Sequence, residues 1–504
     1  MAREPFFHNR RLLLILATLL ALFLAALDTL IMSAAMPTIV ADLGGLHLYS
    51  WVFSTYLLSR TVSLPVFGKL ADLFPTRTLY LISIFIFIAG SVLAGTAQSM
   101  MGLTVFRAVQ GIGAGGNFAL VYIVLADISE PKDRGKMMSY ASFVWGLASV
   151  LGPSLGGFIV SWVSWRWIFY INVPVGLLSM TGIWFFLTET REKNDVIEID
   201  YAGILTLTTA ILSLLTAFLL GGREYGWTSA PILGLFSLFT ASAIGFYAVE
   251  KRSKDPVLCF DFFQSVGFST GTSVVFLSSF AIFSLSAFSP LFIQGALGRS
   301  PFQLGIAMMF LSLGWSVAAL VCGRYCNRWG KKFFALTGSS VLVAGCTLCV
   351  GFSEATNPWI CAMALGMAGA GMGFSSISTL LIVQDSTDPK DLGVATSSHQ
   401  FSRTLGGTIG IGICGSLVTA RFSQIAKILN ASQRQSPIPA SVMEQIQQNF
   451  ENFFRPDLQE QLTVEIKDLL HQAIGSCVID VFWITWIAAA ISLAVGLFLP
   501  KEKT

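Results

Sequence analysis

Long apolar runs separated by short polar stretches are the feature that most constrains how this 504-residue chain can fold. Each run has about 18–25 residues, the length that an α-helix needs to cross a hydrocarbon core roughly 30 Å thick. Apolar and polar residues do not alternate, and the runs are about twice as long as a barrel strand, so transmembrane strands are excluded. Fourteen runs are present, at approximately residues 12–36, 49–69, 79–97, 102–125, 137–160, 166–187, 201–220, 231–249, 268–293, 302–322, 333–352, 358–380, 394–419 and 476–499.

Composition agrees with a protein that crosses the membrane many times. Hydrophobic residues make up 54% of the chain and charged residues only 12%, which lies outside the range of soluble globular proteins. The first run could be mistaken for a signal peptide, because Arg10 and Arg11 precede it in the place of the basic segment of such a peptide. The run is too long for one and no persuasive small-residue cleavage site follows, so we interpret it as a transmembrane helix.

The distribution of basic residues predicts the orientation of the chain. Most of the Lys and Arg residues lie before the first run, in the even-numbered connections and after the last run. Because cytoplasmic loops carry the excess of basic residues, both termini are predicted to be cytoplasmic, in the cell or inner membrane. The net charge of +3 reflects this bias. No basic block indicates nucleic acid, and the scattered cysteines and histidines indicate neither a disulfide framework nor a metal site.

Two halves of the chain are related by an internal repeat. "DISEPKDRG" (127–135) matches "DSTDPKDLG" (385–393) at five of nine positions, and the same offset aligns "GIGAGG" (111–116) with "GAGMGF" (369–374). We therefore predict a six-helix bundle over 1–190, two inserted helices within 191–264, and a second six-helix bundle over 265–504. The glycines are shared and the polar residues are not, so helix packing is the property that the halves have in common.

Repeated halves with a substrate site between them near mid-membrane are typical of transporters that alternate access. The chain has no GxxxxGK[ST] sequence, which argues against ATP binding by a P-loop, so the energy is expected to come from a proton gradient without a cofactor. HExxH is also absent, and no set of nucleophile, base and metal ligands is visible. We expect a secondary active transporter and not an enzyme.

Several motifs carry a resemblance to a known family. "GKLADLFPTRTLYL" (68–81) resembles the loop motif of the major facilitator superfamily, "RAVQGIGAG" (107–115) its helix-four motif and "ASVLGPSLGG" (148–157) its antiporter motif. "LDTLIMSAAMPTI" (27–39) and "WRWIFYINVPVG" (165–176) resemble motifs of the fourteen-helix drug:proton antiporter branch. The resemblance implies an all-α major facilitator fold of fourteen transmembrane helices, in two six-helix bundles plus the two inserted helices.

The loop motif implies a gating network. In the family pattern Asp72, Arg77 and Asp127 form a latch on the cytoplasmic side, and Gly68 permits a tight exit from the helix. Modest, partly hydrated ion pairs suit a latch that must open and close. This chain departs from the pattern, with Pro75 in place of glycine and Leu73 in place of a basic residue. An ordinary basic cytoplasmic loop is the alternative.

The antiporter motif predicts a bend or a close helix crossing. Proline removes a backbone hydrogen bond and glycine removes side-chain bulk. The family associates this motif with export, while ordinary tight packing is an equally good interpretation. The residues concerned are Gly152, Pro153, Gly156 and Gly157.

Charged residues inside the apolar runs are the candidate functional residues, because a charge in hydrocarbon must be paired, neutralised or hydrated. Asp28 lies in the first run. Arg107 lies in the fourth, where the family resemblance implies proton coupling, with Gln110 and Asn117 on the same interior side. Pairing of Arg107 with a backbone carbonyl is the structural alternative.

Arg60, in the second run, stands where the family pattern has a small residue. Adjacent antiparallel helices place it at a depth similar to that of Asp28. If the two side chains pair, the arginine makes Asp28 a poor proton carrier at rest. If they face different cavities, proton and substrate compete for Asp28. A purely structural ion pair is a further interpretation.

In the second half, His399 and Arg403 are four residues apart and therefore share a helix face that must look inward. We predict that both belong to the substrate cavity, together with Arg60, Gln110 and Asn117, although His399 also suits an interfacial position near the cytoplasmic end. Residues 420–475 are predicted to form one long polar extracellular connection with short amphipathic helices.

We predict a monomeric, proton-coupled exporter of hydrophobic drugs or xenobiotics, cationic ones among them, that meets only its small-molecule substrate and the bilayer. One alternative is export of an anionic metabolite or lipid, since the intramembrane arginines outnumber the carboxylates. Another is a proton-independent facilitator, or a membrane receptor without transport. Efflux of cationic dyes against organic anions, and collapse of the pH gradient, distinguish these functions.

Overall fold

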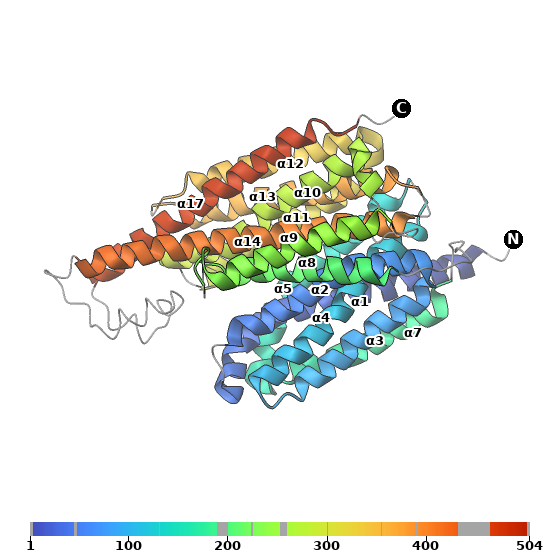
Figure 1. Cartoon of the computed structure of the whole chain (residues 1–504), viewed down its shortest axis with the longest axis horizontal. Coiled ribbons are helices and arrows are strands. Elements are labelled where there is room, and N and C mark those ends of the chain that lie inside the picture. The colour runs from blue at the N-terminus through green and yellow to red at the C-terminus, as the bar shows by residue number, and fades with distance from the viewer. Residues whose placement is uncertain are drawn as a thin grey trace.

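The computed structural model describes residues 4–44, 48–130, 132–188, 200–222, 225–252, 260–299, 301–353, 355–388, 391–431 and 464–500. Over these residues the chain is helical and contains no strand, as expected where lipid leaves backbone groups no partners outside the helix. The helices run roughly parallel to the long axis of the molecule (Figure 1). α1 begins and α17 ends at the same end of the bundle, which we call the terminus end (Figure 1).

The helices follow the apolar runs closely. Their bounds are α1 Glu4–Leu43, α2 Tyr49–Leu73, α3 Thr76–Gly95, α4 Met100–Asp127, α5 Arg134–Trp162, α6 Trp167–Tyr170, α7 Asn172–Phe186, α8 Tyr201–Leu220, α9 Ala230–Glu250, α10 Val266–Pro290, α11 Pro301–Trp329, α12 Lys331–Val350, α13 Pro358–Asp385, α14 Leu392–Ala431 and α17 Val464–Gly496. A π-helical segment, η3 Leu291–Ala296, follows α10, and a short η2 Phe260–Gln264 precedes it.

Two of the predicted boundaries are wrong. α14 continues to Ala431 and α17 begins at Val464, so both ends of the polar connection predicted over 420–475 extend membrane helices. Amphipathic segments next to a helix end continue its hydrogen-bond ladder more readily than they start a new one. The middle of that connection, 432–463, lies outside the described residues. The run predicted at 166–187 is divided into α6 and α7.

Eleven helices among the described residues are long and apolar enough to cross a membrane. α2, α5 and α14 are also long, at 25, 29 and 40 residues, but they are not among these eleven. The predicted count of fourteen spans therefore stays a prediction.

Glycines set the packing within each half, as the repeat predicts. Ideal Cβ atoms built on Gly111 and Gly115 of α4 lie 2.5 Å from backbone oxygens of α2. In the second half, Gly369 and Gly373 of α13 approach the backbone of α11 in the same way, at 2.0 and 2.3 Å. Any side chain at these positions would separate the helices. The shared glycines are thus confirmed as packing residues.

The two halves are joined at the terminus end. α2 packs against α14 and α5 against α11. One cluster of buried apolar residues there combines Leu64 and Met138 of the first half with Cys322, Cys326 and Leu381 of the second. The cluster at the opposite end of the first half, which includes Ile31 to Ile39 and Met100 to Leu103, contains residues of that half alone. Apolar burial therefore holds the halves together mainly at the terminus end.

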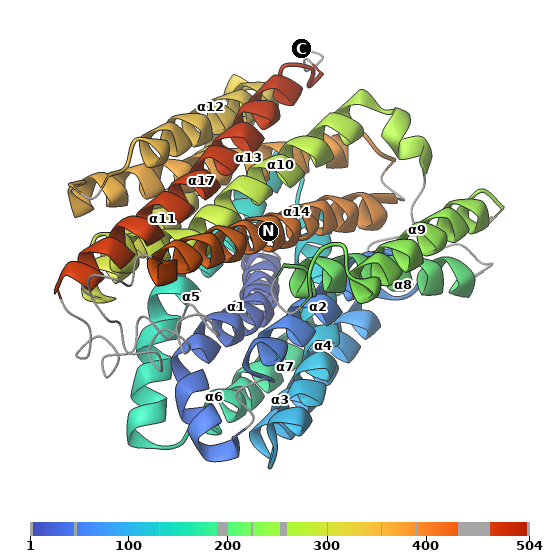
Figure 2. The ribbon, with the colours of Figure 1, turned by 60° about the vertical axis from the view of Figure 1, so that its left-hand side comes forward.

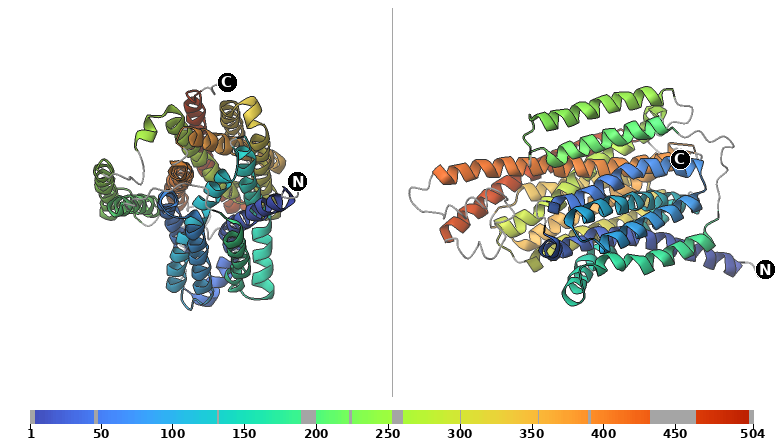
Figure 3. Two further views of the ribbon diagram at one scale, coloured as in Figure 1. Left: turned by 90° about the vertical axis from the view of Figure 1, so that its right-hand side faces the viewer. Right: turned by 60° about the horizontal axis from the view of Figure 1, so that its bottom comes forward.

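α8 and α9 lie on the outside of the bundle (Figure 2). They pack against each other at the edge of the molecule, and α8 also contacts α2 and α14 (Figure 3, left). Ile211 and Leu215 of α8 form a cluster with Leu58 of α2, with Phe401 of α14 packed against it. α8 thus covers the seam where α2 meets α14.

Candidate functional site

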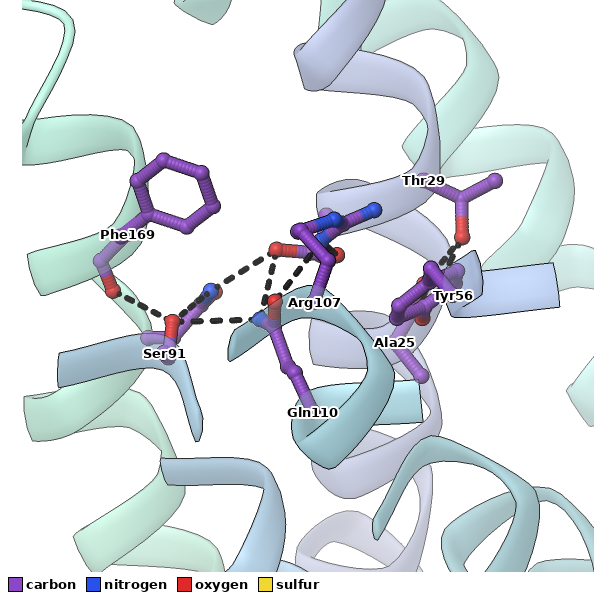
Figure 4. A network of polar contacts seen from close by, with 9 residues as sticks. Ala25, Thr29, Tyr56, Ser91, Arg107, Gln110 and Phe169 are labelled. Carbon is purple, nitrogen blue, oxygen red and sulfur yellow. Dashed lines mark hydrogen bonds and ion pairs between the residues drawn. The ribbon is translucent and has the colours of Figure 1, made fainter. Parts of the chain in front are cut away.

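Asp28 lies at the centre of a buried hydrogen-bond network inside the first half. Figure 4 shows Ser91, Arg107 and Gln110 of this network. Its side chain belongs to α1 and is 2% exposed. Arg107 Nη1 of α4 donates to Asp28 Oδ2 at 2.5 Å. Gln110 Nε2 and Asn172 Nδ2 donate to Asp28 Oδ1 at 2.9 and 3.2 Å. All three partners are donors, which is the pattern of an ionised, acceptor-only carboxylate.

Further contacts fix the orientation of these donors. Gln110 Oε1 accepts a bond of 2.7 Å from Arg107, so the amide links the arginine to the carboxylate. Ser91 of α3 accepts from Asn172 at 2.9 Å and from Gln110 at 3.2 Å, and donates to the carbonyl of Phe169. Residues of α3, α4, α6 and α7 therefore form one network around the carboxylate of α1, which restricts its movement.

Tyr56 of α2 closes the other side of the network. The Arg107 guanidinium carbon lies 4.0 Å from the centre of the Tyr56 ring, within cation–π range. The Tyr56 hydroxyl donates to the carbonyl of Ala25 at 3.3 Å (Figure 4). Arg107 is 1% exposed, and its Nε has no hydrogen-bond partner among the described residues. The arginine is thus held by one carboxylate, one amide and one aromatic face.

Chemically, this arrangement links a proton site to helix contacts. Protonating Asp28 would remove the charge that compensates Arg107 and would add a donor where three donors already converge. The network must then rearrange, and it spans α1, α3, α4, α7 and the face of α2.

Sequence reasoning selected Asp28, Arg107 and Gln110, and the structure brings these three together. It missed Asn172 and Ser91. Asn172 was visible as a polar residue within the apolar "WRWIFYINVPVG" motif, whereas a serine in a membrane helix gives no distinguishing signal.

The suspected pairing of Asp28 with Arg60 is wrong. Among the described residues the ion-pair partner of Asp28 is Arg107, which also excludes a carbonyl as the main partner of that arginine. The Arg60 guanidinium carbon instead lies 4.4 Å from the centre of the Phe118 ring and 5.4 Å from that of Trp145. Similar depth in the membrane brought the two side chains level but did not decide which way each one points.

Arg403 approaches the same aromatic ring from the other half. Its guanidinium carbon lies 5.3 Å from the centre of the Phe118 ring and 5.6 Å from that of Trp315. Arg60 and Arg403 are 6% and 7% exposed, and neither forms an ion pair with a described carboxylate. Two of the residues predicted for the cavity therefore meet between the halves.

Of the other predicted cavity residues, Gln110 belongs to the Asp28 network, and Asn117 and His399 have partners elsewhere. Asn117 accepts a hydrogen bond of 2.7 Å from Ser83 and thus lies between α3 and α4. His399 is fully buried, with Nε2 2.9 Å from the Thr379 hydroxyl, which places it between α13 and α14. Full burial excludes the interfacial alternative for His399.

The predicted gating residues lie at the terminus end. Asp72 accepts hydrogen bonds from the backbone amides of Gly393 and Val394, at 3.1 and 2.9 Å, where α14 begins. A carboxylate at a helix N-terminus is stabilised by the unpaired amides and the helix dipole. Gly68, one turn earlier, lies against Ser397, where a Cβ would approach the serine Cβ to 2.3 Å. Both residues join the first half to the second.

Arg77 lies over the Trp184 ring at 4.9 Å, and Asp127 is the last residue of α4. The three-residue latch of Asp72, Arg77 and Asp127 stays a prediction.

The residues predicted to bend the fifth helix behave differently from one another. α5 is helical throughout Arg134–Trp162. Gly152 lies against Leu30 of α1, where a Cβ would come within 2.8 Å, and Gly156 is buried. Gly157 is exposed with open space around it, so it makes no close crossing. Pro153 lies within the helix, and its side chain is outside the described positions.

The Major Facilitator Superfamily model matches residues 18–411. This range includes the Asp28 network and the two arginines, Arg60 and Arg403, that lie over the Phe118 ring. The chain belongs to this superfamily. It is a transporter and not an enzyme, and its expected family is confirmed. Multidrug transporter protein MdtP of Bacillus subtilis (strain 168) is 34% identical, over 98% of this chain and 94% of the relative. Multidrug resistance protein 3 of the same organism is 30% identical, over 97% of this chain and 95% of the relative.

Solved structures share the fold. The human organic anion transporter MFSD10 (TETRAN) superimposes with a TM-score of 0.63 and 15% identity, over 94% of this chain and 99% of that one. The proton:xylose symporter XylE, bound to 6-bromo-6-deoxy-D-glucose, superimposes with a TM-score of 0.60 and 14% identity, over 98% of this chain and 97% of that one. At such low identity these likenesses concern the major facilitator fold alone.

Proposed function

We propose that this chain is a proton-coupled exporter of hydrophobic drugs or xenobiotics that works by alternating access. Similarity over nearly the whole chain to two multidrug proteins supports the efflux role. The observation that supports proton coupling is the buried Asp28 carboxylate, held by Arg107 at 2.5 Å inside membrane helices. An intramembrane carboxylate that is paired rather than solvated is a typical proton relay.

Coupling follows from the number of donors around Asp28. In the ionised state the carboxylate draws α1, α4 and Asn172 of α7 together. A proton on Asp28 weakens these bonds and leaves Arg107 uncompensated, which favours a different arrangement of the helices. The two protonation states thus favour two conformations, as an antiporter requires.

Alternating access is supported by the way in which the halves meet. Two hydrogen bonds that Asp72 accepts from backbone amides at the start of α14 join the halves toward the terminus end. The Ser316 hydroxyl of α11 donates a further one to the carbonyl of Ser142 of α5 at 3.2 Å. With both termini in the cytoplasm, as the basic loops predict, this conformation is the one closed toward the cytoplasm. We propose that rocking about these contacts opens the transporter inward.

The remaining features of the proposal follow from the sequence. The transporter lies in the cell or inner membrane as a monomer, with its substrate and the lipid bilayer as its partners and with no cofactor other than the proton gradient. Fourteen helices cross the membrane, in two six-helix bundles flanking α8 and α9.

The test uses everted membrane vesicles that contain the full chain. A panel of hydrophobic dyes of either charge is added, and accumulation is followed with and without nigericin, which collapses the pH gradient. We expect accumulation that nigericin abolishes and that Asp28→Asn abolishes at normal expression. Asp480→Asn is the matched control, because Asp480 also lies in a membrane helix but is 37% exposed and pairs with Arg421 at 2.9 Å.

Accumulation that survives nigericin would identify a proton-independent facilitator. Unchanged gradient-driven accumulation in Asp28→Asn would remove the proposed role of this carboxylate. A panel in which no dye moves would favour the receptor alternative.

A further inference from the structure

Two buried arginines from opposite halves share one aromatic ring. Arg60 of α2 and Arg403 of α14 lie 4.4 and 5.3 Å from the centre of the Phe118 ring. Their guanidinium carbons are therefore within about 10 Å of each other, well inside the range of electrostatic repulsion where water is excluded. In an apolar interior, two like charges this close destabilise the protein unless something compensates them.

The aromatic rings offset part of this cost, but no described carboxylate compensates the two charges. Neither guanidinium forms an ion pair with a described carboxylate, and Asp28 is already occupied by Arg107. Arg60 Nε is buried and has no hydrogen-bond partner among the described residues. Trp145 Nε1, on the ring that Arg60 faces, is a second buried donor without a partner there. Unpaired donors and uncompensated positive charge in one place are complementary to an anion.

The position of these residues suits a substrate site. Each lies roughly nine to fourteen residues from the terminus end of its own helix, which at about 1.5 Å per residue is 14–21 Å into the membrane. This is near mid-membrane, on the boundary between the halves, where transporters of this architecture bind their cargo. Trp315 contributes a further aromatic face beside Arg403, and Phe283 packs edge-on against Trp315 at 6.1 Å.

We infer that Arg60, Arg403 and the aromatic rings around Phe118 form a binding site for an amphiphilic organic anion, with the acidic group between the two guanidinium groups. This inference rests on the proposed transport function and narrows its substrate class. Bidentate donation by arginine fits a carboxylate or sulfonate, and the rings fit an aromatic body.

The site is also placed to sense the proton site. Arg60 follows Tyr56 by four residues on α2, so the two share a helix face, and Tyr56 contacts Arg107 at 4.0 Å. A displacement of Arg107 when Asp28 is protonated would act on α2 and thereby on Arg60. Because Arg403 belongs to the other half, rocking of the halves would separate the two positive charges and weaken the binding of the anion.

The test is equilibrium binding to the full chain in lipid nanodiscs without a proton gradient, so that failure of coupling does not affect it. Fluorescein and rhodamine 123 share a xanthene ring system, and the first is an anion while the second is a cation. We expect fluorescein to bind and rhodamine 123 to bind at least tenfold more weakly. Arg60→Gln and Arg403→Gln should each weaken fluorescein binding about ten- to a hundredfold.

Two further variants separate binding from folding. Arg403→Lys keeps the charge and should recover part of the affinity. Arg421→Gln changes an arginine that is on the same helix but 53% exposed, and should leave the affinity unchanged. Preferential binding of rhodamine 123, or fluorescein affinity that is equal in wild type and in folded Arg60→Gln and Arg403→Gln, would overturn the inference.

Discussion

Arg107 and Arg60 are both almost fully buried, at 1% and 6% exposed, but one is paired and the other is not. The same substitution to glutamine should therefore have opposite effects on stability. In Arg107→Gln, the Asp28 carboxylate keeps its two amide donors but loses its charge partner. Removing one partner of a buried ion pair costs about 3–5 kcal/mol, and the remaining donors place this case near the lower value.

Arg60→Gln removes cation–π contacts with two rings, each worth about 0.5–2 kcal/mol, but it also removes a desolvated charge whose burial costs several kcal/mol. The free energy of unfolding should therefore stay the same or rise. The two variants should differ by about 3 kcal/mol or more, which is roughly a hundredfold in the unfolding equilibrium. Titration with SDS in detergent micelles, followed by the loss of helical circular dichroism, measures this difference.

A double-mutant cycle supplies the control. Asp28→Asn alone leaves Arg107 uncompensated, whereas Asp28→Asn combined with Arg107→Gln leaves no buried charge. The double variant should be more stable than the sum of the two single effects, by about 0.5–3 kcal/mol. Additive losses, or a loss in Arg60→Gln equal to that in Arg107→Gln, would refute the reasoning.

Three other outcomes follow from the packing and the loops. Gly115→Leu should destabilise the first half by more than about 1–3 kcal/mol, because a Cβ at this position lies 2.5 Å from the backbone of α2. Gly157 has open space around it, so the control Gly157→Ala should change the free energy of unfolding by less than about 0.5 kcal/mol in the same SDS titration. Asp72→Ala removes two charge-assisted hydrogen bonds with the start of α14, worth about 1.5–3 kcal/mol each. Spin labels on α2 and α14 should therefore report longer distances between these helices at the terminus end. An unchanged distribution of distances would contradict a role of Asp72 in closing the halves at that end. Hydrogen bonds from Trp165 and Arg166, which precede α6, hold the pKa of Asp42 below its ordinary value of 3.8. Its stabilising effect is therefore complete above that value and lost as pH falls through the lowered pKa. Asp42→Asn should be less stable than wild type at about pH 7, and the difference in stability should shrink as the pH is lowered below 3.8; a difference that stays constant in acid would show another cause.

Helix positions and packing glycines could be predicted because their causes are local. A run of apolar residues has one stable conformation in lipid, and a glycine shared by both halves marks a close approach whatever helix it meets. Gly115 and Gly373 therefore contact α2 and α11 as the repeat implies. The ends of α14 and α17 were predicted less well, since polar residues that leave the membrane can continue a helix as easily as they can end it.

The partner of Asp28 could not be predicted in the same way. The sequence gives the depth of a residue along its helix, but each residue also turns the side-chain direction by about 100°, and the rotation of a helix depends on all of its neighbours. Arg60 has the right depth and points to Phe118, whereas Arg107 turns toward Asp28. Ser91 and Asn172 join the network for the same reason, and even Asn172, a polar residue in an apolar motif, gives no sign of the partner that it meets.

By itself, the sequence determined that the chain is a polytopic membrane transporter of two related halves, because apolar length, repeats and motifs are properties of consecutive residues. Only the tertiary structure decided that Asp28 is paired with Arg107 and that Arg60 meets Arg403 across the boundary of the halves. Such pairings depend on the relative rotation and crossing of helices far apart in the chain. In an apolar interior those geometric details decide whether a buried charge is compensated or available to bind a ligand.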